Sequence, residues 1–166
     1  MNRASTLAAA AILIVAGACT SSSTGPEDAE AQSIEELPAK AEQGDAEAQY
    51  LLGEAYYFGQ GVEQDSEEAV DRWTKAAEQG HADAQYRLGE AYYFGQGVEE
   101  DPEEAVHWFR KAAEQGHAEA QYELGEAYHF GEGVEQDHTE AVRWWTKAAD
   151  QGHADAGEIL AGLAKP

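Results

Sequence analysis

Basic residues and cysteine are both scarce in this sequence. Ten Lys and Arg residues stand against 33 Asp and Glu residues, which gives a formal net charge of −23 at pH 7. Nucleic acid phosphates and anionic lipid head groups bind basic surfaces, so the charge disfavours a nucleic acid partner and loose association with anionic membranes. It suits a highly soluble surface, a basic partner or a saline environment that screens self-repulsion. Because only five residues are lysine, a halophilic source is one hypothesis.

The N-terminal region lacks an apolar segment long enough to cross a membrane. Its apolar run, Leu7–Ala18, is shorter than the roughly 20 residues that span a bilayer. Arg3 before the run and small residues after it are typical of a secretory signal peptide. The letters AGA at 16–18 fit an ordinary signal peptidase site, whereas AGAC at 16–19 resembles the bacterial lipobox, whose cysteine receives lipid. Both interpretations cut the chain before Cys19.

Cys19 is the only cysteine, so the fold needs no internal disulfide. We predict a signal peptide at 1–18, followed by lipidated Cys19 and a disordered tether at 19–32, because the letters TSSSTGPEDAEAQ have no apolar periodicity. The alternative is a secreted protein with a chance cysteine. Thr20 after the cysteine, in place of Asp, favours the outer membrane by resemblance to Gram-negative lipoproteins. We therefore expect an exported outer-membrane lipoprotein that faces the periplasm or the cell surface and contacts the membrane by its lipid anchor only.

The rest of the chain repeats every 36 residues. AEQGDAEAQY at 41–50 returns as AEQGHADAQY at 77–86 and AEQGHAEAQY at 113–122, and ADQGHADAGE at 149–158 begins a fourth copy. Two stretches of each unit place apolar residues on one helical face; in the first unit these are Ala48, Leu52, Ala55 and Tyr56, then Ala69, Trp73, Ala76 and Ala77. Two such helices cannot bury their apolar faces alone. The repeat therefore predicts an all-α, right-handed α-solenoid of stacked helix pairs.

Helix boundaries are marked in every unit. An Asp precedes each second helix as N-cap, with Glu three residues later as in a capping box: Asp65 and Glu68, Asp101 and Glu104, Asp137 and Glu140. A glycine in position for a left-handed C-terminal cap follows each second helix: Gly80, Gly116 and Gly152. Within a solenoid at 33–165, we predict an N-terminal cap at 33–44, bent or delayed by Pro38. Repeats follow at about 45–80, 81–116 and 117–152, with a closing helix at 153–165.

These units carry a family resemblance. AEAQYLLGEAYYFGQGVEQDSEEAVDRWTKAAEQG at 46–80 resembles the Sel-one-like repeat (SLR), a relative of the tetratricopeptide repeat, almost throughout. The second unit departs from it by having Phe109 in the place of Trp73, with Trp108 one residue earlier. The resemblance implies adaptor and assembly roles and no shared catalytic residues. Some cysteine-rich bacterial members have been linked to penicillin binding or β-lactam hydrolysis, but their repeat disulfides are absent here.

Three recurring features could be taken for ligand sites. Gly59-Gln60-Gly61 resembles half of a dinucleotide fingerprint, but a helix precedes it and acidic residues follow, so it predicts a turn with Val62 packed beneath it. The intrahelical glycines Gly53, Gly89 and Gly125 predict close helix contact, because each costs about 1 kcal/mol relative to Ala. His81, His117 and His153 occur once per repeat, too far apart to share a metal ion, and are predicted to be exposed after a cap.

Signatures of a catalytic nucleophile are missing. The sequence has no G-x-S-x-G or S-x-x-K motif, and serine lies mainly in the first 33 residues. Carboxylates are plentiful, but the sequence singles out no acid–base pair. We therefore predict no enzymatic activity, no cofactor and no metal.

The remaining candidate site is the face of the first helices that points away from the core. In tetratricopeptide-type solenoids these helices line the concave side. A stripe of aromatic residues and carboxylates there would suit an extended peptide with Lys or Arg; its members are Tyr50, Glu54 and Tyr57, then Tyr86, Glu90 and Tyr93, then Tyr122, Glu126 and His129. The alternative is that these tyrosines pack between repeats. Leu51, Arg87 and Glu123 occupy the position that differs most in chemistry between copies, which predicts an exposed position that either is free to vary or tunes a partner.

Three hypotheses for function follow. The first is a non-catalytic scaffold, anchored in a bacterial envelope, that binds an unknown protein or peptide; a basic partner would suit its acidic charge. The second is a periplasmic hydrolase of cell-wall or β-lactam material, which the missing nucleophile motifs and disulfides disfavour. The third is a structural spacer with no partner.

Overall fold

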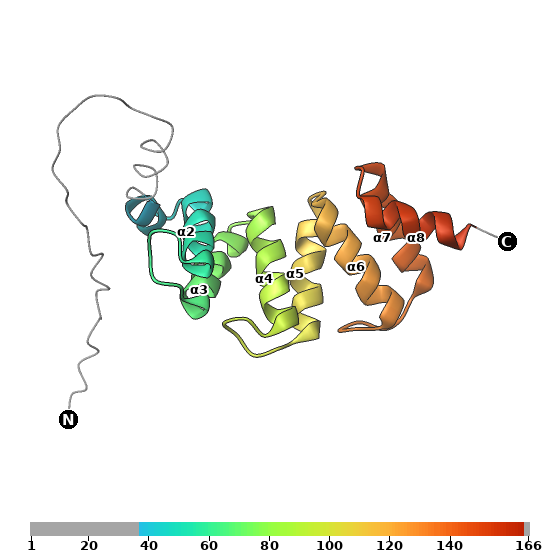
Figure 1. The fold of residues 1–166 in the computed structure, drawn as a ribbon, viewed down its shortest axis with the longest axis horizontal. Helices are drawn as coiled ribbons and strands as arrows, with labels where there is room; N and C mark the ends of the chain where they lie inside the picture. The colour runs from blue at the N-terminus through green and yellow to red at the C-terminus, as the bar shows by residue number, and fades with distance from the viewer. Residues whose placement is uncertain (1–36, 165–166) are drawn as a thin grey trace.

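The computed structural model describes residues 37–164, which form consecutive helices and, within that range, no strands (Figure 1). After a helical segment at 37–42, seven helices follow: α2 (Ala46–Phe58), α3 (Ser66–Glu78), α4 (Ala82–Phe94), α5 (Pro102–Glu114), α6 (Ala118–Phe130), α7 (His138–Asp150) and α8 (Ala154–Leu163). The signal peptide, Cys19, the tether and residues 33–36 of the predicted N-terminal cap lie outside the described residues. The described part of that cap is helical and includes Pro38, and Ala41 within it is buried.

Helices that follow one another in the chain pack against one another, which makes a row of helix pairs along the longest axis of the molecule (Figure 1). Each repeat contributes one pair: α2 with α3, α4 with α5, and α6 with α7. The predicted α-solenoid with a 36-residue period is confirmed. Its core is built mainly from small residues, because the two largest buried clusters each contain several alanines packed around one or two aromatic rings, a leucine and a valine.

The aspartates predicted to cap the second helices do so. Asp65 Oδ1 accepts from the backbone N–H groups of Glu67 and Glu68, both at 3.1 Å. The other half of the predicted capping box, in which the Glu68 carboxylate would accept from the backbone N–H of Asp65, is wrong. The backbone N–H of Asp65 donates instead to the carbonyl of Tyr56 at 2.9 Å, and the Glu68 carboxylate pairs with Arg72. The turn from the first helix to the second supplies the partner that a capping box would have provided.

The histidines that begin α4, α6 and α8 are N-caps, and the prediction that they are exposed is wrong. His81 Nδ1 accepts from the backbone N–H of Ala84 at 3.2 Å, which leaves the proton on Nε2, 2.9 Å from Glu47 Oε2. The ring also stacks on Tyr50 of the preceding repeat at 4.8 Å between centroids, so only 14% of the His81 side chain is exposed. The residue therefore joins two repeats as well as starting a helix.

The glycines inside the first helices allow close packing, as predicted. A Cβ added at Gly53 would lie 2.5 Å from two atoms of the Trp73 ring, and one added at Gly125 would lie equally close to Trp145. In the second repeat the ring that approaches Gly89 belongs to Phe109. The Trp-to-Phe exchange therefore preserves the contact, because both residues present a flat ring to the glycine.

The Gly-x-Gly loops are turns, as predicted, and they also join repeats. Gly59 ends α2 in the left-handed conformation at φ 67°, which reverses the chain without a Cβ penalty. The second glycine of the next loop, Gly97, lies so close to α3 that an added Cβ would be 2.2 Å from the carbonyl oxygen of Ser66. Gly133 approaches Pro102 in the same way, at 2.0 Å. Each loop thus rests on the start of the second helix of the repeat before it.

Buried glutamines connect consecutive helices. Gln85 is 4% exposed; its Nε2 donates to the carbonyl of Ala77 at 3.0 Å, and its Oε1 accepts from Gln115 Nε2 at 2.7 Å. Gln49 and Gln121 make the equivalent bonds in the other two repeats. A buried polar side chain is costly unless its hydrogen bonds are made, so this arrangement favours one register of stacking.

Replacing Gly89 by Ala tests the glycine contact. The new methyl group would meet the Phe109 ring, and overpacking of this kind costs about 1–3 kcal/mol, against a helix-propensity gain of about 1 kcal/mol. We expect a net loss in the free energy of unfolding, measured by urea denaturation followed by circular dichroism. The matched control is Gly157→Ala in α8, where an added Cβ meets nothing within 4 Å and should stabilise. Equal stability of the two variants would contradict the packing argument.

The two roles of the histidine caps can be separated in His117. His117→Ala removes a cap worth about 1 kcal/mol and a ring contact with Tyr86 worth up to about 1.5 kcal/mol. His117→Asp keeps a cap, because Asp45 caps the first repeat at the equivalent position, and removes the ring together with its 3.2 Å contact to Asp83. We expect the Asp variant to lose about half the unfolding free energy that the Ala variant loses at pH 7. A loss as large as that of the Ala variant would show that the contacts of the ring with Tyr86 and Asp83 matter and that the cap does not.

Candidate protein-interaction surface

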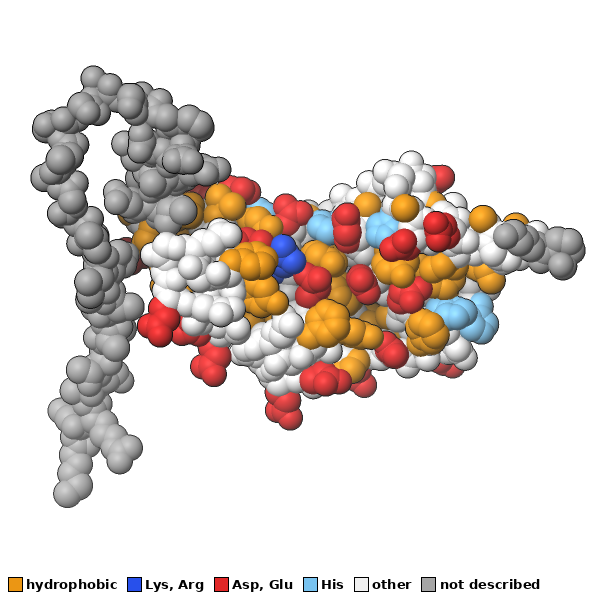
Figure 2. Space-filling view, in the orientation of Figure 1, with side chains coloured by type: hydrophobic (Ala, Val, Ile, Leu, Met, Phe, Trp, Pro, Cys, Tyr) orange, Lys and Arg blue, Asp and Glu red, His pale blue; other side chains and the backbone are white. Residues whose placement is uncertain are grey.

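The outward sides of α2, α4 and α6 form one continuous surface, which we call the first-helix face. Figure 2 shows hydrophobic side chains gathered on it, with carboxylates between them and a single basic patch. The nine residues of the predicted peptide-binding stripe, and Arg87 beside them, all belong to these three helices. They fall into three groups, which differ in what they touch.

The inner tyrosines of the stripe pack between repeats. Tyr50, Tyr86 and Tyr122 stack on His81, His117 and His153 at 4.8, 4.6 and 4.5 Å between ring centroids. Their interplanar angles of 23°, 21° and 11° describe parallel rings. The packing alternative is therefore what the structure shows for these three residues, each of which remains partly exposed.

The outer aromatic residues reach toward the loop of the next repeat. Tyr57 Oη donates to Gln96 Oε1 at 2.7 Å, and Tyr93 Oη donates to Glu132 Oε2 at 2.8 Å. The hydrogen bond to Glu132 raises the pKa of Tyr93 to about 12, with burial adding to the effect. His129 has no such bond and lies against Trp145 and His138 at 5.2 and 5.0 Å. The third copy of this position therefore makes a different contact.

Arg87 lies between two carboxylates of the stripe. Its Nη2 is 3.0 Å from Glu54 Oε2, on the preceding repeat, and its Nη1 is 3.0 Å from Glu90 Oε2, one turn along α4. Burial raises the pKa of Glu54 although Arg87 opposes it, and Glu54 Oε1 is buried with no hydrogen-bond partner. The expectation that this variable position is exposed holds for Leu51, at 38%, and is wrong for Arg87, whose side chain is 30% exposed.

Glu123 occupies the place of Arg87 in the third repeat. Burial raises its pKa to about 7, and the neighbouring carboxylates of Glu90 and Glu126 add to the shift. The same position thus holds a cation between two carboxylates at one junction and a third carboxylate at the next. This difference is the largest chemical change among otherwise equivalent parts of the first-helix face.

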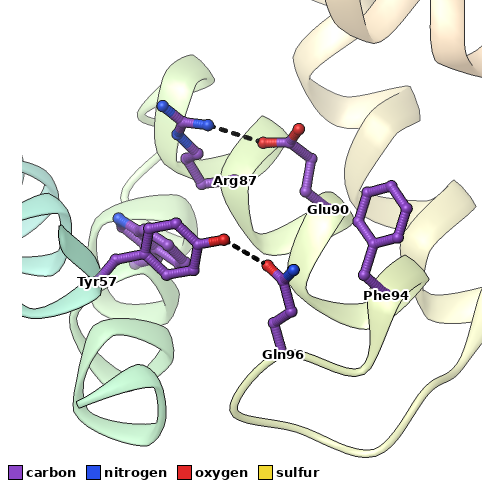
Figure 3. A pocket seen from close by; sticks show the side chains of 6 residues that line it. Tyr57, Arg87, Glu90, Phe94 and Gln96 are labelled. Carbon is purple, nitrogen blue, oxygen red and sulfur yellow. Dashed lines mark hydrogen bonds and ion pairs between the residues drawn. The ribbon is translucent and has the colours of Figure 1, made fainter. Parts of the chain in front are cut away.

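A small cavity opens on the face between the first and second repeats (Figure 3). Its volume is about 100 Å³, and it is lined by Tyr57, Trp73, Arg87, Glu90, Phe94 and Gln96. Figure 3 shows the dashed pairs of Arg87 with Glu90 and of Tyr57 with Gln96 on two sides of this space, with Phe94 beyond them. The cavity therefore combines aromatic walls with polar groups that already satisfy one another.

Sequence reasoning missed a row of exposed phenylalanines. Phe58, Phe94 and Phe130 end the three first helices and are 52%, 61% and 60% exposed. Each ring meets the aromatic residue before it edge to face, at 5.0, 4.9 and 4.7 Å. Helical projection carries the signal, because Phe58 lies well away from the apolar face marked by Ala48 and Leu52. Exposed apolar side chains repeated along one face are typical of interaction surfaces.

Comparison with protein families identifies the repeat. The family model described as the Sel1 repeat matches residues 46–81, 82–117 and 118–153, which together make up more than half of the chain. The chain belongs to the Sel1 repeat family. Each matched unit begins one residue later than the boundary predicted from the sequence. Sel1 repeat proteins are generally non-catalytic protein-interaction scaffolds.

Solved Sel1 repeat structures resemble this one. A protective antigen of uropathogenic Escherichia coli with an SLR fold is 43% identical with a TM-score of 0.76, over 78% of this chain and 28% of its own. A Sel1 repeat protein from Oxalobacter formigenes is 38% identical with a TM-score of 0.69, over 76% of this chain and 57% of its own. The cysteine rich protein B of Helicobacter pylori shares the fold at 21% identity and a TM-score of 0.62, over 81% of this chain and 97% of its own.

This chain thus spans less than two thirds of the length of the first two relatives. A search of curated proteins finds no match to it.

Two further properties of the Sel1 repeats bear on the candidate surface. Within residues 37–164, no group of three or more His, Cys, Asp and Glu side chains is arranged to hold a metal ion. In the same range, no helix is both long and apolar enough to cross a membrane.

Glu123 predicts a pH dependence of stability. Because its pKa is raised to about 7 in the folded protein, from an ordinary value near 4.5, the folded state favours its protonated form. The contribution of Glu123 to the free energy of unfolding is full below about pH 4.5 and is lost as the pH rises through 7. Glu123→Gln, which stays neutral, should therefore stabilise the protein at pH 8 and change little at pH 5. Melting temperatures of both proteins at the two pH values measure this.

The groups that face Glu123 bear on the same titration: Glu90 on α4, Glu126 on α6, and the tyrosines Tyr86, Tyr93 and Tyr122, whose pKa values its charge raises. The control is Glu119→Gln on the same helix, since Glu119 is exposed at the start of α6. A gain for Glu123→Gln that is the same at both pH values would contradict the prediction.

Proposed function

We propose that this Sel1 repeat protein is a non-catalytic scaffold, anchored to a bacterial cell envelope by lipid on Cys19, that binds a protein or peptide partner with its first-helix face. One observation carries the binding role. Phe58, Phe94 and Phe130 are each more than half exposed and form a row beside Tyr57 and its equivalents. Aromatic residues are enriched at protein interfaces, where their burial contributes most of the binding free energy.

The envelope location rests on the sequence. The apolar run before Cys19, the letters AGAC and the polar stretch after the cysteine are together typical of a lipoprotein precursor. Thr20 after the cysteine favours the outer membrane. A single acyl chain gives only marginal membrane binding, whereas several chains on one cysteine would give stable attachment.

Membrane fractionation and partner capture test this proposal in one experiment. The full chain is expressed in a Gram-negative host with radiolabelled palmitate, as wild type and as Cys19→Ala. We expect the wild type to be labelled and to sediment with outer membranes, and the variant to be unlabelled and soluble. An unlabelled, soluble wild type would overturn the anchor.

Crosslinking of the same membranes, followed by purification of the protein, tests the binding role. We expect a protein partner that is captured by wild type and lost with Tyr93→Ala/Phe94→Ala. Leu163→Ala is the matched control, because Leu163 is 58% exposed on α8, away from the face. Glu54 is a poor target, since its carboxylate is buried against Arg87 and a charge change there would disturb the fold. Absence of any partner would favour a structural spacer.

A further inference from the structure

The two repeat junctions on the first-helix face share one architecture and differ in charge. Each junction pairs an outer tyrosine with the loop of the next repeat and ends at an exposed phenylalanine. Of the six positions that line the cavity at the first junction (α2 with α4), three change at the second (α4 with α6): Trp73 to Phe109, Arg87 to Glu123, and Gln96 to Glu132. Two of these changes make the second junction more acidic. A segment lying across both would therefore meet two unlike sites.

The first junction suits an apolar side chain. Its cavity of about 100 Å³ has Tyr57, Trp73 and Phe94 among its walls. This is roughly the volume of three waters in the liquid, enough for a small aliphatic side chain. Its charged residues are already paired, since Arg87 contacts both Glu54 and Glu90 at 3.0 Å. An entering group therefore gains most from contact with the aromatic rings.

The second junction suits a cation. Glu123, Glu126 and Glu132 lie on it, and Glu90 approaches from α4. Among residues 37–164, no Lys or Arg forms an ion pair with Glu123 or Glu126. Burial is the main cause of the raised pKa of Glu123, and the repulsion from Glu90 and Glu126 that adds to it would fall if a cation lay among these carboxylates.

The spacing between the two junctions fits an extended chain. Glu54 on α2 reaches Arg87 on α4 through long side chains, whereas the backbones of α2 and α4 both pack against α3, so consecutive first helices are separated by somewhat more than the roughly 8–10 Å of directly packed helices. An extended peptide advances about 3.3 Å per residue. One repeat therefore corresponds to about three to four residues of a bound segment.

From these observations we infer a specific partner chemistry, which rests on the proposed binding role of the first-helix face. The bound segment is an extended peptide in which an aliphatic side chain enters the cavity at Tyr57 and Phe94. A Lys or Arg three residues away lies against Glu123 and Glu126. The exposed ring of Phe130 covers the methylene stem of that basic residue.

Synthetic peptides titrated into the ¹⁵N-labelled mature chain at pH 8 test the inference, with amide shifts as the readout. The probe is an acetylated, amidated Ser-Leu-Ser-Ser-Lys-Ser peptide. Three comparison peptides place Lys directly after Leu, replace Leu by Ser, or replace Lys by Glu. We expect saturable shifts near Phe94 and Glu123 with the probe, and binding at least about fivefold weaker with each comparison peptide. Equal binding of the peptide with adjacent Leu and Lys would overturn the three-residue spacing.

Protein variants locate the basic residue. Glu123→Arg recreates the arrangement found at Arg87 and should weaken binding of the probe about tenfold, because attraction becomes repulsion. Glu114→Arg makes the same charge change at an exposed position in the last turn of α5 and should leave binding nearly unchanged. Glu126→Gln is the milder second variant and should weaken binding severalfold. Equal effects of Glu123→Arg and Glu114→Arg would mean nonspecific attraction to an acidic protein and would overturn the inference.

The outcome is separable from that of the envelope experiment. A partner captured from membranes, together with no response to the probe peptide, would leave the scaffold role standing and reject this peptide chemistry. A specific response to the probe with no membrane partner would support the peptide chemistry and count against the proposed scaffold role.

Discussion

Contact between a glycine in each first helix and an aromatic ring in its partner helix sets the geometry on which the whole solenoid depends. With 2.5 Å between the ring of Trp73 and the place of a Cβ on Gly53, no other residue fits unless the ring or the helix that carries it shifts. The rings of Phe109 and Trp145 repeat the contact. Because each ring fills the space between two helices, alanine suffices at most other core positions. The repeat is thus compact although few of its buried side chains are large.

Contacts between repeats use a second set of close approaches. Gly97 and Gly133 rest on the backbone at the start of the preceding second helix, buried glutamines connect consecutive helices, and His–Tyr stacks join the ends of the first helices. These contacts are polar or steric, so they depend on orientation more than a purely apolar interface would. In a solenoid each repeat touches only its neighbours, and a contact that fixes one junction is therefore needed at all of them. This explains why the same letters return at intervals of 36 residues.

Much of the fold could be predicted from the sequence because its signals are local and repeated. Helical spacing of Ala48, Leu52 and Ala55 identifies a buried face, and Asp65 and Gly80 mark helix ends by backbone geometry alone. The missed features depend on partners distant in sequence. His81 is kept from solvent by Tyr50 of another repeat, and the hydrogen bonds of Gln85 run to Ala77 and Gln115. The predicted capping box is wrong for the same reason, since the backbone N–H of Asp65 donates to the carbonyl of Tyr56 and not to the Glu68 carboxylate.

The position of the candidate surface could be predicted from the sequence, whereas the ion pairs on it could not. Projection along one helix placed Glu54 and Tyr57 away from the core, but it could not show that Arg87 bridges Glu54 and Glu90 across two repeats. The Gly–aromatic contacts and the glutamine hydrogen bonds lie in the core and between repeats, whereas position 87 and its equivalents lie on the first-helix face. Arg can therefore become Glu there while the Gly–aromatic contacts and the glutamine bonds stay in place. What changes is electrostatic: Glu123 sits among carboxylates, with a pKa raised to about 7. Because the negative charge of Glu123 is unfavourable where it lies, a cation that binds beside it is strongly stabilised. The exchange of Arg for Glu at this position therefore lowers folding stability and favours binding of a cation.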